Sequence, residues 1–145
     1  MTITHAQLKD LDALIGLFEG YRIFYKQEPN PQAAKRFLTQ RIVKNDSIIY
    51  IAYVNNQPAG FTQLYPLFSS VYMKSIYMLN DLYVASKFRN QGIGEALINR
   101  AKHLCQSENN KGMAIQTAFD NPAQHLYERL GFERDTDLQF FWKNA

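Results

Sequence analysis

Over residues 79–97, an apolar, strand-like run passes through a glycine-bearing turn into a helix, and this transition constrains the fold more than any other feature of the sequence. The turn, residues 89–94, reads RNQGIG. Glycine has no Cβ, so the backbone at Gly92 and Gly94 can approach a ligand closely. The first N–H groups of a helix lack intrahelical partners and favour an anion, and Arg89 adds a fixed positive charge. The stretch therefore predicts a site for a phosphate or pyrophosphate group at the start of a helix.

Two common phosphate-binding motifs do not fit this stretch. A P-loop needs a Lys followed by Ser or Thr after its glycines, and the sequence has neither there. A dinucleotide-binding motif needs a third Gly or Ala, where this chain has Leu97, and an acidic residue about 20 positions further on, where Met113–Thr117 has none. The sequence therefore disfavours both nucleotide hydrolysis and dinucleotide binding.

The other sequence patterns predict the element order β-α-α-β-β-β-α-β-α-β. Runs rich in β-branched and aromatic residues, or with strict alternation, predict strands at Thr2–Thr4, Ser47–Val54, Ala59–Tyr65, Tyr72–Val84, Met113–Thr117 and Leu138–Trp142. Apolar residues at helical spacing predict helices at Leu8–Tyr25, at Pro31–Lys44, from Gly92 to the polar segment Ser107–Lys111, and between Asn121 and Gly131.

This order predicts how the elements pack. Consecutive strands in the middle of the chain favour antiparallel hairpins, with a break at Pro66–Ser70, and the strand–helix–strand unit after Leu79 favours a parallel crossover. The expected fold class is α/β, with a mixed, mostly antiparallel central sheet of six to seven strands and helices on both faces. The 145 residues, 46% of them hydrophobic, fit a single domain over residues 1–145.

Charge, cysteine and histidine content argue against several classes of function. The formal net charge is +3, but no Lys/Arg run resembles a nucleic-acid-binding surface, so we expect no nucleic-acid partner. The single cysteine, Cys105, rules out an internal disulfide. Without a signal peptide or a membrane-spanning apolar run, we expect a cytoplasmic protein with no membrane contact. The histidines His5, His103 and His125 lack the spacing of metal ligands, so no metal is expected.

Two motifs in the second half of the chain point to one family. The turn carries Arg-x-x-Gly-x-Gly, as Arg89, Gly92 and Gly94, where a helix follows a strand. Further along, the pattern Asn-x-x-Ala-x-x-Leu-Tyr-x-x-x-Gly-Phe stands nearly complete, as Asn121, Gln124 where Ala is usual, Leu126, Tyr127, Gly131 and Phe132. With these motifs and its predicted strand order, the sequence resembles the GNAT superfamily of N-acetyltransferases over almost its full length. It looks closest to the small histone- and polyamine-acetyltransferase-like members.

The resemblance implies acetyl-CoA as co-substrate. It implies that the pyrophosphate lies on the N–H groups of about residues 91–94. The pantetheine arm would run beside residues 82–84, in a slot where the strands after Asp81 and from Met113 splay apart, held by main-chain hydrogen bonds like a peptide added to a sheet edge. The cofactor-binding residues that the resemblance implies are Leu82, Tyr83, Val84, Arg89, Asn90, Gln91, Gly92, Ile93, Gly94, Asn121 and Tyr127.

Tyr127 and Asp81 are the catalytic candidates. In the superfamily, a tyrosine at the position of Tyr127 lies by the cofactor sulfur, where it protonates or hydrogen-bonds the departing thiolate. The alternative is a core tyrosine, because Tyr127 shares a helical stripe with Leu126 and Leu130. Asp81 is an acid in an apolar strand beside the slot, where desolvation would raise the pKa of a carboxyl and suit it to deprotonate an ammonium group; the alternative is a structural carboxylate. Cys105 is interpreted as core and not as an acetyl-accepting thiol.

The acceptor side is predicted from the first two helices and from the loop near residues 66–73. Aromatic and acidic side chains there suit a cationic amine, although packing explains each ring as readily. We select Tyr25, Glu28 and Asn80 for substrate binding. The expected reaction is direct acetyl transfer from acetyl-CoA to a primary amine of a small polyamine-like molecule or to a lysine side chain, with the N–H near Val84 polarising the carbonyl. The alternatives are a non-catalytic acetyl-CoA-binding sensor or partner module, and an acetyltransferase for an aminoglycoside-type or other small acceptor.

The C-terminal segment predicts an assembly. Apolar and other side chains alternate over Leu138–Trp142, and an apolar edge strand is a liability when it is left exposed. Pairing in a homodimer would cover the strand, as the resemblance also implies. We therefore expect a homodimer through the C-terminal strand.

Overall fold

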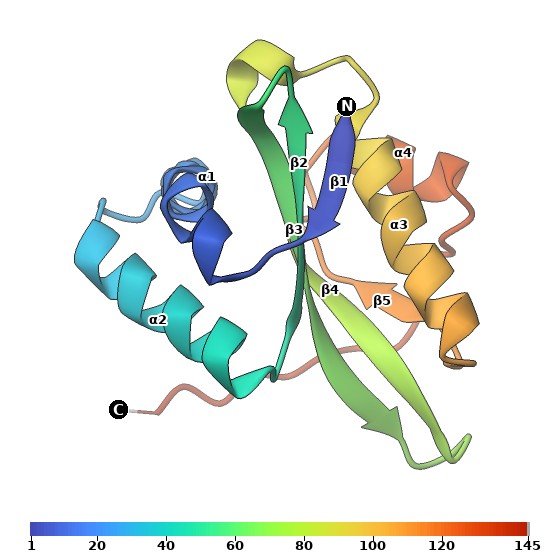
Figure 1. The fold of residues 1–145 in the computed structure, drawn as a ribbon. Helices are drawn as coiled ribbons and strands as arrows, with labels where there is room; N and C mark the ends of the chain where they lie inside the picture. Colours follow the sequence, from blue (N-terminus) through green and yellow to red (C-terminus); the bar gives the residue numbers. More distant parts are fainter. Residues whose placement is uncertain (145) are drawn as a thin grey trace.

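The chain is built around one central sheet (Figure 1). The computed structural model describes residues 1–144 and has five strands in the order β1-β2-β3-β4-β5. The strands are β1 (Thr2–His5), β2 (Ile48–Val54), β3 (Gln57–Ser69), β4 (Lys74–Val84) and β5 (Met113–Ile115). The helices are α1 (Leu11–Phe24), α2 (Pro31–Lys44), α3 (Ile93–Ser107) and α4 (Gln124–Arg129), and the 3₁₀ turns η1 (Leu8–Asp10) and η2 (Ser86–Phe88) lie before α1 and α3. Strands β1 to β4 pair antiparallel and β4 pairs with β5 in parallel, which confirms the predicted mixed α/β sheet.

Helices cover both faces of the sheet, with α1 and α2 on one side and α3 and α4 on the other (Figure 1). The unbroken apolar run of β2 explains this arrangement, because alternate side chains of a strand point to opposite faces. Ile49 and Ile51 enter the core against α1 and α2, whereas Tyr50 and Ala52 enter the core against α3. All four are at most 5% exposed, so β2 contributes fully to both cores.

A bulge in β4 changes which side chains face which core. Gln63 of β3 lies opposite Asp81 of β4. The next residue of β3, Leu64, lies opposite Leu79, so Asn80 is an extra residue in β4. Strict alternation would send Asp81 into the same α3-side core as Leu79. Because of the extra residue, Asp81 instead faces the tyrosines of α1.

Strands β4 and β5 separate after a short paired stretch. Their register runs only from Tyr77 with Met113 to Leu79 with Ile115, although β4 continues to Val84. Beyond Leu79, the edge of β4 that faces β5 has no strand partner among residues 1–144. The separation leaves an opening of the kind that the resemblance implies for a pantetheine arm.

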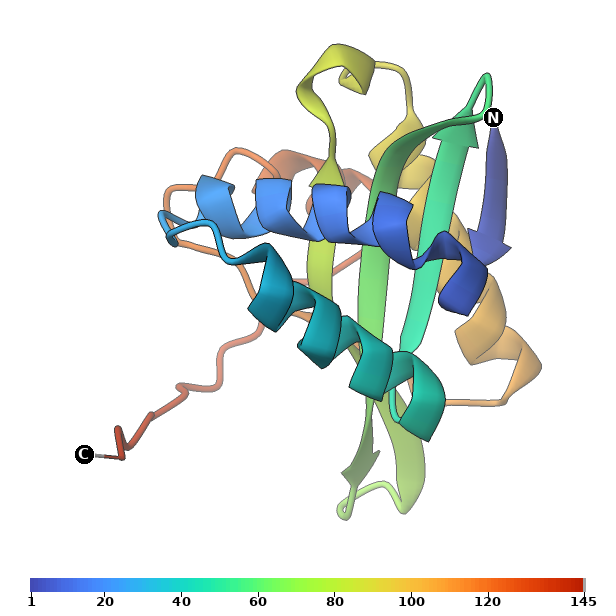
Figure 2. The ribbon, with the colours of Figure 1, turned by 60° about the vertical axis from the view of Figure 1, so that its left-hand side comes forward.

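Several strand boundaries differ from the prediction by one to four residues. β3 continues through Pro66 to Ser69, where the sequence predicted a break, and β3 and β4 project from the sheet as a long hairpin (Figure 2). Pro66 lies opposite Tyr77 of β4, but β2 pairs with β3 no further than Leu64. The other edge of β3 is therefore open at Pro66, so the missing N–H of proline interrupts no ladder. β5 is shorter than predicted and ends at Ile115.

The predicted sixth strand, Leu138–Trp142, is wrong for the single chain. Residues 1–144 form five strands rather than six to seven. The segment after α4 runs away from the body of the protein (Figures 1 and 2). Its apolar side chains are between 80% and 88% exposed; they are Leu138, Phe140, Phe141 and Trp142. Alternation yields a strand only where a neighbouring strand supplies main-chain hydrogen bonds. Among residues 1–144 no strand pairs with this segment, although the Gln139 side chain accepts from Nε2 of Gln116.

Candidate active site

The turn before α3 contains two residues in the left-handed region. Asn90 has φ +62° and Gly92 has φ +80°, a conformation that asparagine and glycine adopt more readily than other residues. The N–H of Ala96 donates to the carbonyl oxygen of Gly92 at 3.0 Å and makes the first hydrogen bond of the helix. The N–H groups of residues 93–95 therefore have no hydrogen-bond acceptor within the helix. Residues 89–92 are exposed, so the predicted anion site is open to solvent.

Main-chain groups of β4 face the opening between β4 and β5. The N–H of Ala85 donates to the carbonyl oxygen of Ala59 at 2.8 Å, which shows that Ala85 points toward β3. Adjacent residues of a strand point to opposite edges, so Leu82 and Val84 point to the open edge. Arg89 folds back to this edge, where its Nε donates to the carbonyl oxygen of Val84 at 3.0 Å. The end of β4 thus offers peptide groups to an extended ligand.

Gly94 lies where the start of α3 meets β4 and α4. A Cβ at this position would lie 3.7 Å from Cδ2 of Leu126 and 3.9 Å from Cγ2 of Val84, which are ordinary contact distances. Its φ is not positive, so neither packing nor backbone conformation requires glycine there. A ligand that approaches the backbone from the open edge of β4 does require it. Gly94 therefore fits a ligand site.

Two of the predicted cofactor residues have side chains directed into the protein. Ile93 is 2% exposed and packs in the α3-side core. The Tyr83 ring packs toward α1, where a Cβ on Gly20 would come within 2.6 Å of its hydroxyl oxygen, and the Arg89 guanidinium lies 5.8 Å from the ring centre. At Ile93 and Tyr83, only the main chain is placed to meet a ligand in the opening.

Asp81 is a buried carboxylate held by side-chain amides. It is 2% exposed, with Oδ2 accepting from Nε2 of Gln63 at 2.6 Å and Oδ1 accepting from Nδ2 of Asn80 at 2.7 Å. Burial raises the pKa of Asp81, and the hydrogen bonds from Asn80 and Gln63 partly oppose that effect. A carboxyl with a raised pKa is suited to take a proton from a substrate. Sequence reasoning missed Gln63, because only the strand register places it opposite Asp81.

Tyrosines surround Asp81 on the α1 side. The Tyr21 hydroxyl donates to the carbonyl oxygen of Asn80 at 3.1 Å, and the Tyr21 ring packs edge-on against Tyr25 with ring centres 5.0 Å apart. Burial, followed by the charge of Asp81, raises the pKa of Tyr21 and of Tyr65 well above the ordinary range, so both phenols stay protonated. Both belong to the aromatic side chains that the sequence assigns to the acceptor side, but neither is among the three selected for substrate binding; the i, i+4 spacing of Tyr21 and Tyr25 was the available signal.

Tyr127 reaches the site from the other face of the sheet. It is half-buried on α4, packs against the α3-side core, and has its ring centre 6.3 Å from that of Phe132. Burial, and then the neighbouring Tyr25, raises the pKa of Tyr127. Tyr25 packs against Tyr21, whose hydroxyl lies beside the Asn80–Asp81 stretch of β4. The structure therefore brings two predicted residues, Tyr25 and Asp81, to the α1 side of the sheet, whereas Tyr127 packs on the α3 side.

Two other predicted residues have local partners. Glu28 is exposed in the loop after α1, where its carbonyl oxygen accepts from Nη1 of Arg22 at 2.9 Å. Nδ2 of Asn121 donates to Oγ1 of Thr117 at 2.9 Å, and its Oδ1 accepts from the N–H of Ala123 at 3.0 Å. In this structure, the Asn121 side chain shapes the turn that leads into α4.

A hollow of about 1660 Å³ lies beside β5. Its walls include β5, Tyr127 of α4, and residues Gln139 and Phe141 of the C-terminal segment. Cys105 borders it but is 7% exposed, and burial raises the pKa of its thiol, as expected for an unreactive core cysteine. Within residues 1–144, no cluster of three His, Cys, Asp or Glu side chains could bind a metal ion, and no helix is long and apolar enough to cross a membrane.

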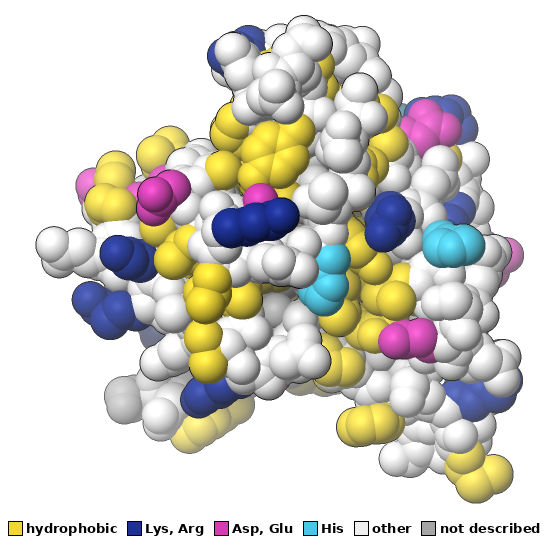
Figure 3. All heavy atoms as spheres, viewed as in Figure 1, with side chains coloured by type: hydrophobic (Ala, Val, Ile, Leu, Met, Phe, Trp, Pro, Cys, Tyr) yellow, Lys and Arg dark blue, Asp and Glu magenta, His cyan; other side chains and the backbone are white. Residues whose placement is uncertain are grey.

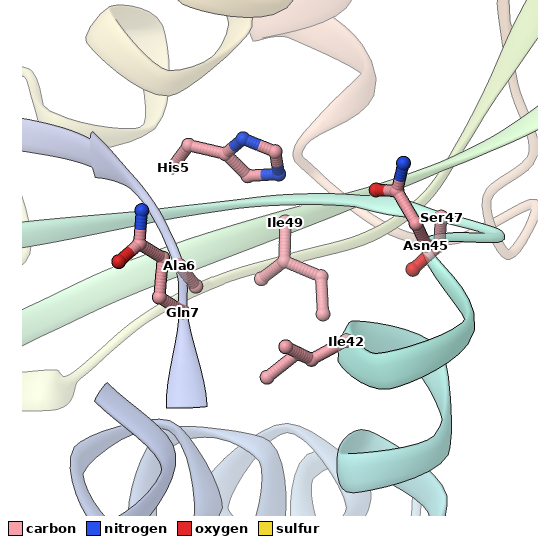
Figure 4. A pocket seen from close by; sticks show the side chains of 7 residues that line it. All are labelled: His5, Ala6, Gln7, Ile42, Asn45, Ser47 and Ile49. Carbon is pink, nitrogen blue, oxygen red and sulfur yellow. The ribbon is translucent and has the colours of Figure 1, made fainter. Parts of the chain in front are cut away.

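A smaller cavity of about 170 Å³ lies where β1 and α2 end and β2 begins (Figure 4). It is lined by His5, Ala6, Gln7, Ile42, Asn45, Ser47 and Ile49. Ser47 connects this cavity with the surroundings of Asp81, because its hydroxyl donates to Oε1 of Gln63 at 2.9 Å.

Charged side chains are dispersed over the face of the molecule in Figure 3. Lys and Arg side chains lie apart on that face, with acidic side chains between them, and form no continuous patch. A continuous basic surface is the usual mark of nucleic-acid binding. The expected lack of a nucleic-acid partner stays a prediction.

Comparison with known proteins places this site in a family. Residues 45–134 match the acetyltransferase (GNAT) domain. The chain belongs to the GNAT acetyltransferases. It is 42% identical over 146 residues to an uncharacterized N-acetyltransferase of Bacillus subtilis (strain 168), YhfO, in an alignment that covers 100% of this chain and 98% of that protein.

Solved structures agree with this assignment. The crystal structure of a probable acetyltransferase is 36% identical, with a TM-score of 0.93, and the match covers 100% of this chain and 98% of that one. An aminoglycoside acetyltransferase from an uncultured soil metagenomic sample is 19% identical, with a TM-score of 0.83 over 99% of this chain and 96% of that one. At that identity, the second likeness shows the fold alone.

The GNAT domain match covers one part of this N-acetyltransferase and leaves out its first two helices. It spans β2 to α4 and so includes Asp81, the turn at residues 89–94 and Tyr127. Members of the family generally use acetyl-CoA as the donor. Helices α1 and α2, with Tyr21 and Tyr25, lie outside the matched residues. The shared part is thus the part that carries the open edge of β4 and the anion site.

Proposed function

We propose that this GNAT enzyme transfers the acetyl group of acetyl-CoA directly to a primary amine of a small polyamine-like molecule or of a lysine side chain. The observation that carries the proposal is Asp81, a buried carboxylate among tyrosines and beside the open edge of β4. A cationic amine is attracted both to a carboxylate and to aromatic faces. Tyr25 and Asn80 flank the same region, and the exposed Glu28 adds a negative charge in the loop after α1.

The residues present fit acetyl-CoA. Main-chain groups of Leu82 and Val84 at the open edge suit the pantetheine amides, and the N–H groups at the start of α3, with Arg89, suit the pyrophosphate. Gly94 leaves space that a Cβ would fill. We assign Asn121, in the turn that precedes α4, to the wall of the slot that faces β4, where it would hold the pantetheine arm.

The proposed mechanism moves one acetyl group and two protons. Acetyl-CoA supplies the acetyl thioester, with CoA thiolate as leaving group. Asp81 takes a proton from the acceptor ammonium, directly or through water, and the free amine attacks the carbonyl carbon. The N–H of Val84, at the open edge of β4, polarises the carbonyl oxygen. The C–N bond forms, the C–S bond breaks, and Tyr127 donates its hydroxyl proton to the sulfur. The second proton of the attacking nitrogen then returns to the Tyr127 oxygen, so the products are the N-acetyl amide and CoA with a free thiol, and Asp81 releases its proton to solvent.

An acceptor screen tests this proposal. Release of free CoA from acetyl-CoA is measured with polyamines, a lysine-containing peptide and an aminoglycoside, each against a blank without acceptor. We expect release above the blank with the polyamines or the peptide. Release with the aminoglycoside alone would reassign the acceptor class, and no release in any arm would favour a non-catalytic acetyl-CoA-binding module.

Gly94→Ala is expected to raise the KM for acetyl-CoA by about tenfold, equivalent to about 1.4 kcal/mol of lost binding, without lowering Tm. The added Cβ meets Leu126 and Val84 only at ordinary contact distances but enters the space assigned to the ligand. Alanine also favours a helix over glycine by about 0.5–1 kcal/mol. Gly16→Ala is the matched control, because Gly16 is exposed on α1 with nothing within 4 Å of its Cβ position. An unchanged KM in Gly94→Ala would contradict the assigned cofactor position.

We also infer that two copies of the chain pair through their C-terminal segments. Residues 138–142 alternate like a strand and are exposed, while β5 at the edge of the sheet has an unpaired side that adjoins the hollow. Analytical ultracentrifugation should show a dimer for the full chain and a monomer after deletion of residues 138–145. The single tryptophan, Trp142, should emit at shorter wavelength in the dimer. Phe140→Ser keeps the length and should weaken the dimer; a full chain that is monomeric at high concentration would rule this pairing out.

We propose a cytoplasmic location for the enzyme. The single cysteine, Cys105, is free and buried, which suits a reducing compartment. Cell fractionation with an antibody to the native chain tests this assignment.

A further inference from the structure

Two polar side chains lie behind Asp81, out of contact with solvent. Gln63 of β3 is 0% exposed, and Ser47, just before β2, is 5% exposed. Their neighbours on this face of the sheet are apolar and include Ile49 and Phe61. A buried polar group costs stability unless it is hydrogen-bonded, and an apolar side chain of similar size would fill the same space. The presence of Gln63 and Ser47 therefore needs a reason beyond packing.

The two side chains form a directed series of hydrogen bonds that ends at Asp81. The Ser47 hydroxyl donates to Oε1 of Gln63 at 2.9 Å, and Nε2 of Gln63 donates to Oδ2 of Asp81 at 2.6 Å. Because the amide oxygen is occupied by Ser47, the amide presents its N–H to the carboxylate. A hydrogen bond to the charged form of a carboxyl favours that form. The β3–β4 register, in which Gln63 and Asp81 lie opposite each other, keeps their side chains on one face.

We propose that Gln63, oriented by Ser47, is a positioning residue that holds the Asp81 carboxylate ionised and fixed in direction for the acceptor amine. This inference rests on the role that the proposed function gives to Asp81. Asn80 holds the other carboxylate oxygen from its own strand at 2.7 Å. Gln63 therefore acts through orientation and charge stabilisation and does not itself transfer a proton.

No charged group contacts Asp81 within residues 1–144, so neutral hydrogen-bond donors stabilise its ionised form. Tyr21 from α1 and Tyr65 from β3 are the titratable groups beside it, and burial raises the pKa of each far enough to keep it uncharged. Asp81 forms no ion pair within residues 1–144. Arg41 of α2, whose charge acts on Tyr65, lies 2.9 Å from Asp46. The amides of Gln63 and Asn80 are thus the groups that donate to the carboxylate and favour its ionised form.

The test is the pH dependence of kcat/KM in Gln63→Leu, measured on the full chain with an acceptor from the screen. We expect the midpoint of the acid limb to rise by about 1 pH unit, because a hydrogen bond to the charged form is lost. The ionisation of the acceptor amine affects the pH profile of the wild type and of every variant equally, so it does not change the difference between their midpoints. Gln63→Glu should raise the midpoint further, since two carboxyl groups would then share one site. Ser47→Ala should raise the midpoint less than Ser47→Val does. Alanine leaves room for a water molecule from the adjoining 170 Å³ cavity to replace the lost hydroxyl as a donor to Gln63, whereas valine fills that room.

Thr62→Val is the matched control for loss of a buried hydrogen bond. Thr62 is 0% exposed beside Gln63, and its hydroxyl donates at 2.8 Å to the main-chain oxygen of Asp81, not to the carboxylate. This variant should lower Tm and leave the midpoint unchanged. A Gln63→Leu variant that behaves in the same way, with no change in the ionisation of Asp81 itself, would overturn the proposal.

A second measurement does not depend on activity. The carboxyl band of Asp81, obtained as the infrared difference between each protein and its Asp81→Asn counterpart, reports the ionisation of this side chain directly. We expect the Gln63→Leu midpoint to rise in this titration as well, and an unchanged midpoint would overturn the role of Gln63. If the band moves and the rate profile does not, Gln63 does control the ionisation of Asp81, but Asp81 is not the base of the proposed mechanism.

Discussion

Replacing Asp81 with Asn is expected to lower kcat for acetyl transfer by about 10²- to 10⁴-fold, the range for loss of a positioned acid–base group. The new side chain keeps the size of the old one, and its Oδ1 can still accept from Asn80. Gln63 can turn its amide and offer Oε1 to the new NH₂ group. The fold is therefore retained while the base is lost. Steady-state kinetics with an acceptor from the screen measure the change.

The same substitution is expected to stabilise the protein at high pH. Burial raises the pKa of Asp81 above its usual 3.8, so ionising this side chain costs the folded state free energy that it does not cost the unfolded state. The wild-type protein therefore loses stability as the pH rises through the raised pKa, and Asp81→Asn does not. The Tm of the variant relative to the wild type should increase with pH, by about 2–4 °C for each kcal/mol.

Asp10 provides a matched control for Asp81. It is 8% exposed, and its carboxylate accepts from the Tyr53 hydroxyl at 2.8 Å and from the N–H of Gln7 at 2.9 Å, outside the site. Asp10→Asn should leave kcat unchanged. If Asp81→Asn also keeps the wild-type kcat, another group is the base and Asp81 is a structural carboxylate.

Features that depend on neighbouring residues were predictable from the sequence. The turn around Gly92 lies at the start of α3, as expected, because left-handed backbone and helix starts have local signals. The start of α2 is another case: Asn30 precedes Pro31, and its side chain accepts from the N–H of Ala33 at 3.1 Å. The helix start at which we propose the anion site was therefore accessible to sequence reasoning alone.

Features that depend on strand pairing were not predictable in the same way. The bulge at Asn80 has no glycine or proline to mark it, so alternation placed Asn80 and Asp81 on opposite faces. In the structure, the Asn80 side chain turns back to the Asp81 carboxylate. The contribution of Gln63 follows from the same register. The strand at Leu138–Trp142 was predicted from its alternation, but no partner strand is available to it among residues 1–144.

Replacing Tyr127 with Phe is expected to lower kcat by about 10²-fold, with little change in the KM for acetyl-CoA or in Tm. The variant keeps the ring that packs against the α3-side core and Phe132, and it loses only the hydroxyl. Burial and the neighbouring Tyr25 raise the pKa of Tyr127 above 10.0, so the phenol stays protonated as an acid throughout the neutral range. Single-turnover measurements at saturating acetyl-CoA isolate the transfer step from product release.

Tyr77→Phe distinguishes loss of an acid from loss of a buried hydroxyl. The Tyr77 ring lies in the α3-side core, and its hydroxyl donates at 2.6 Å to Oε1 of the exposed Glu108 just after α3, outside the opening between β4 and β5. Its removal should lower stability by about 0.5–1.5 kcal/mol and leave the transfer rate unchanged. Tyr127→Phe should show the opposite pattern, with a slow transfer step and unchanged stability. If its rate matches the wild type, the thiolate departs without help from Tyr127, which then serves only to pack α4 against the core.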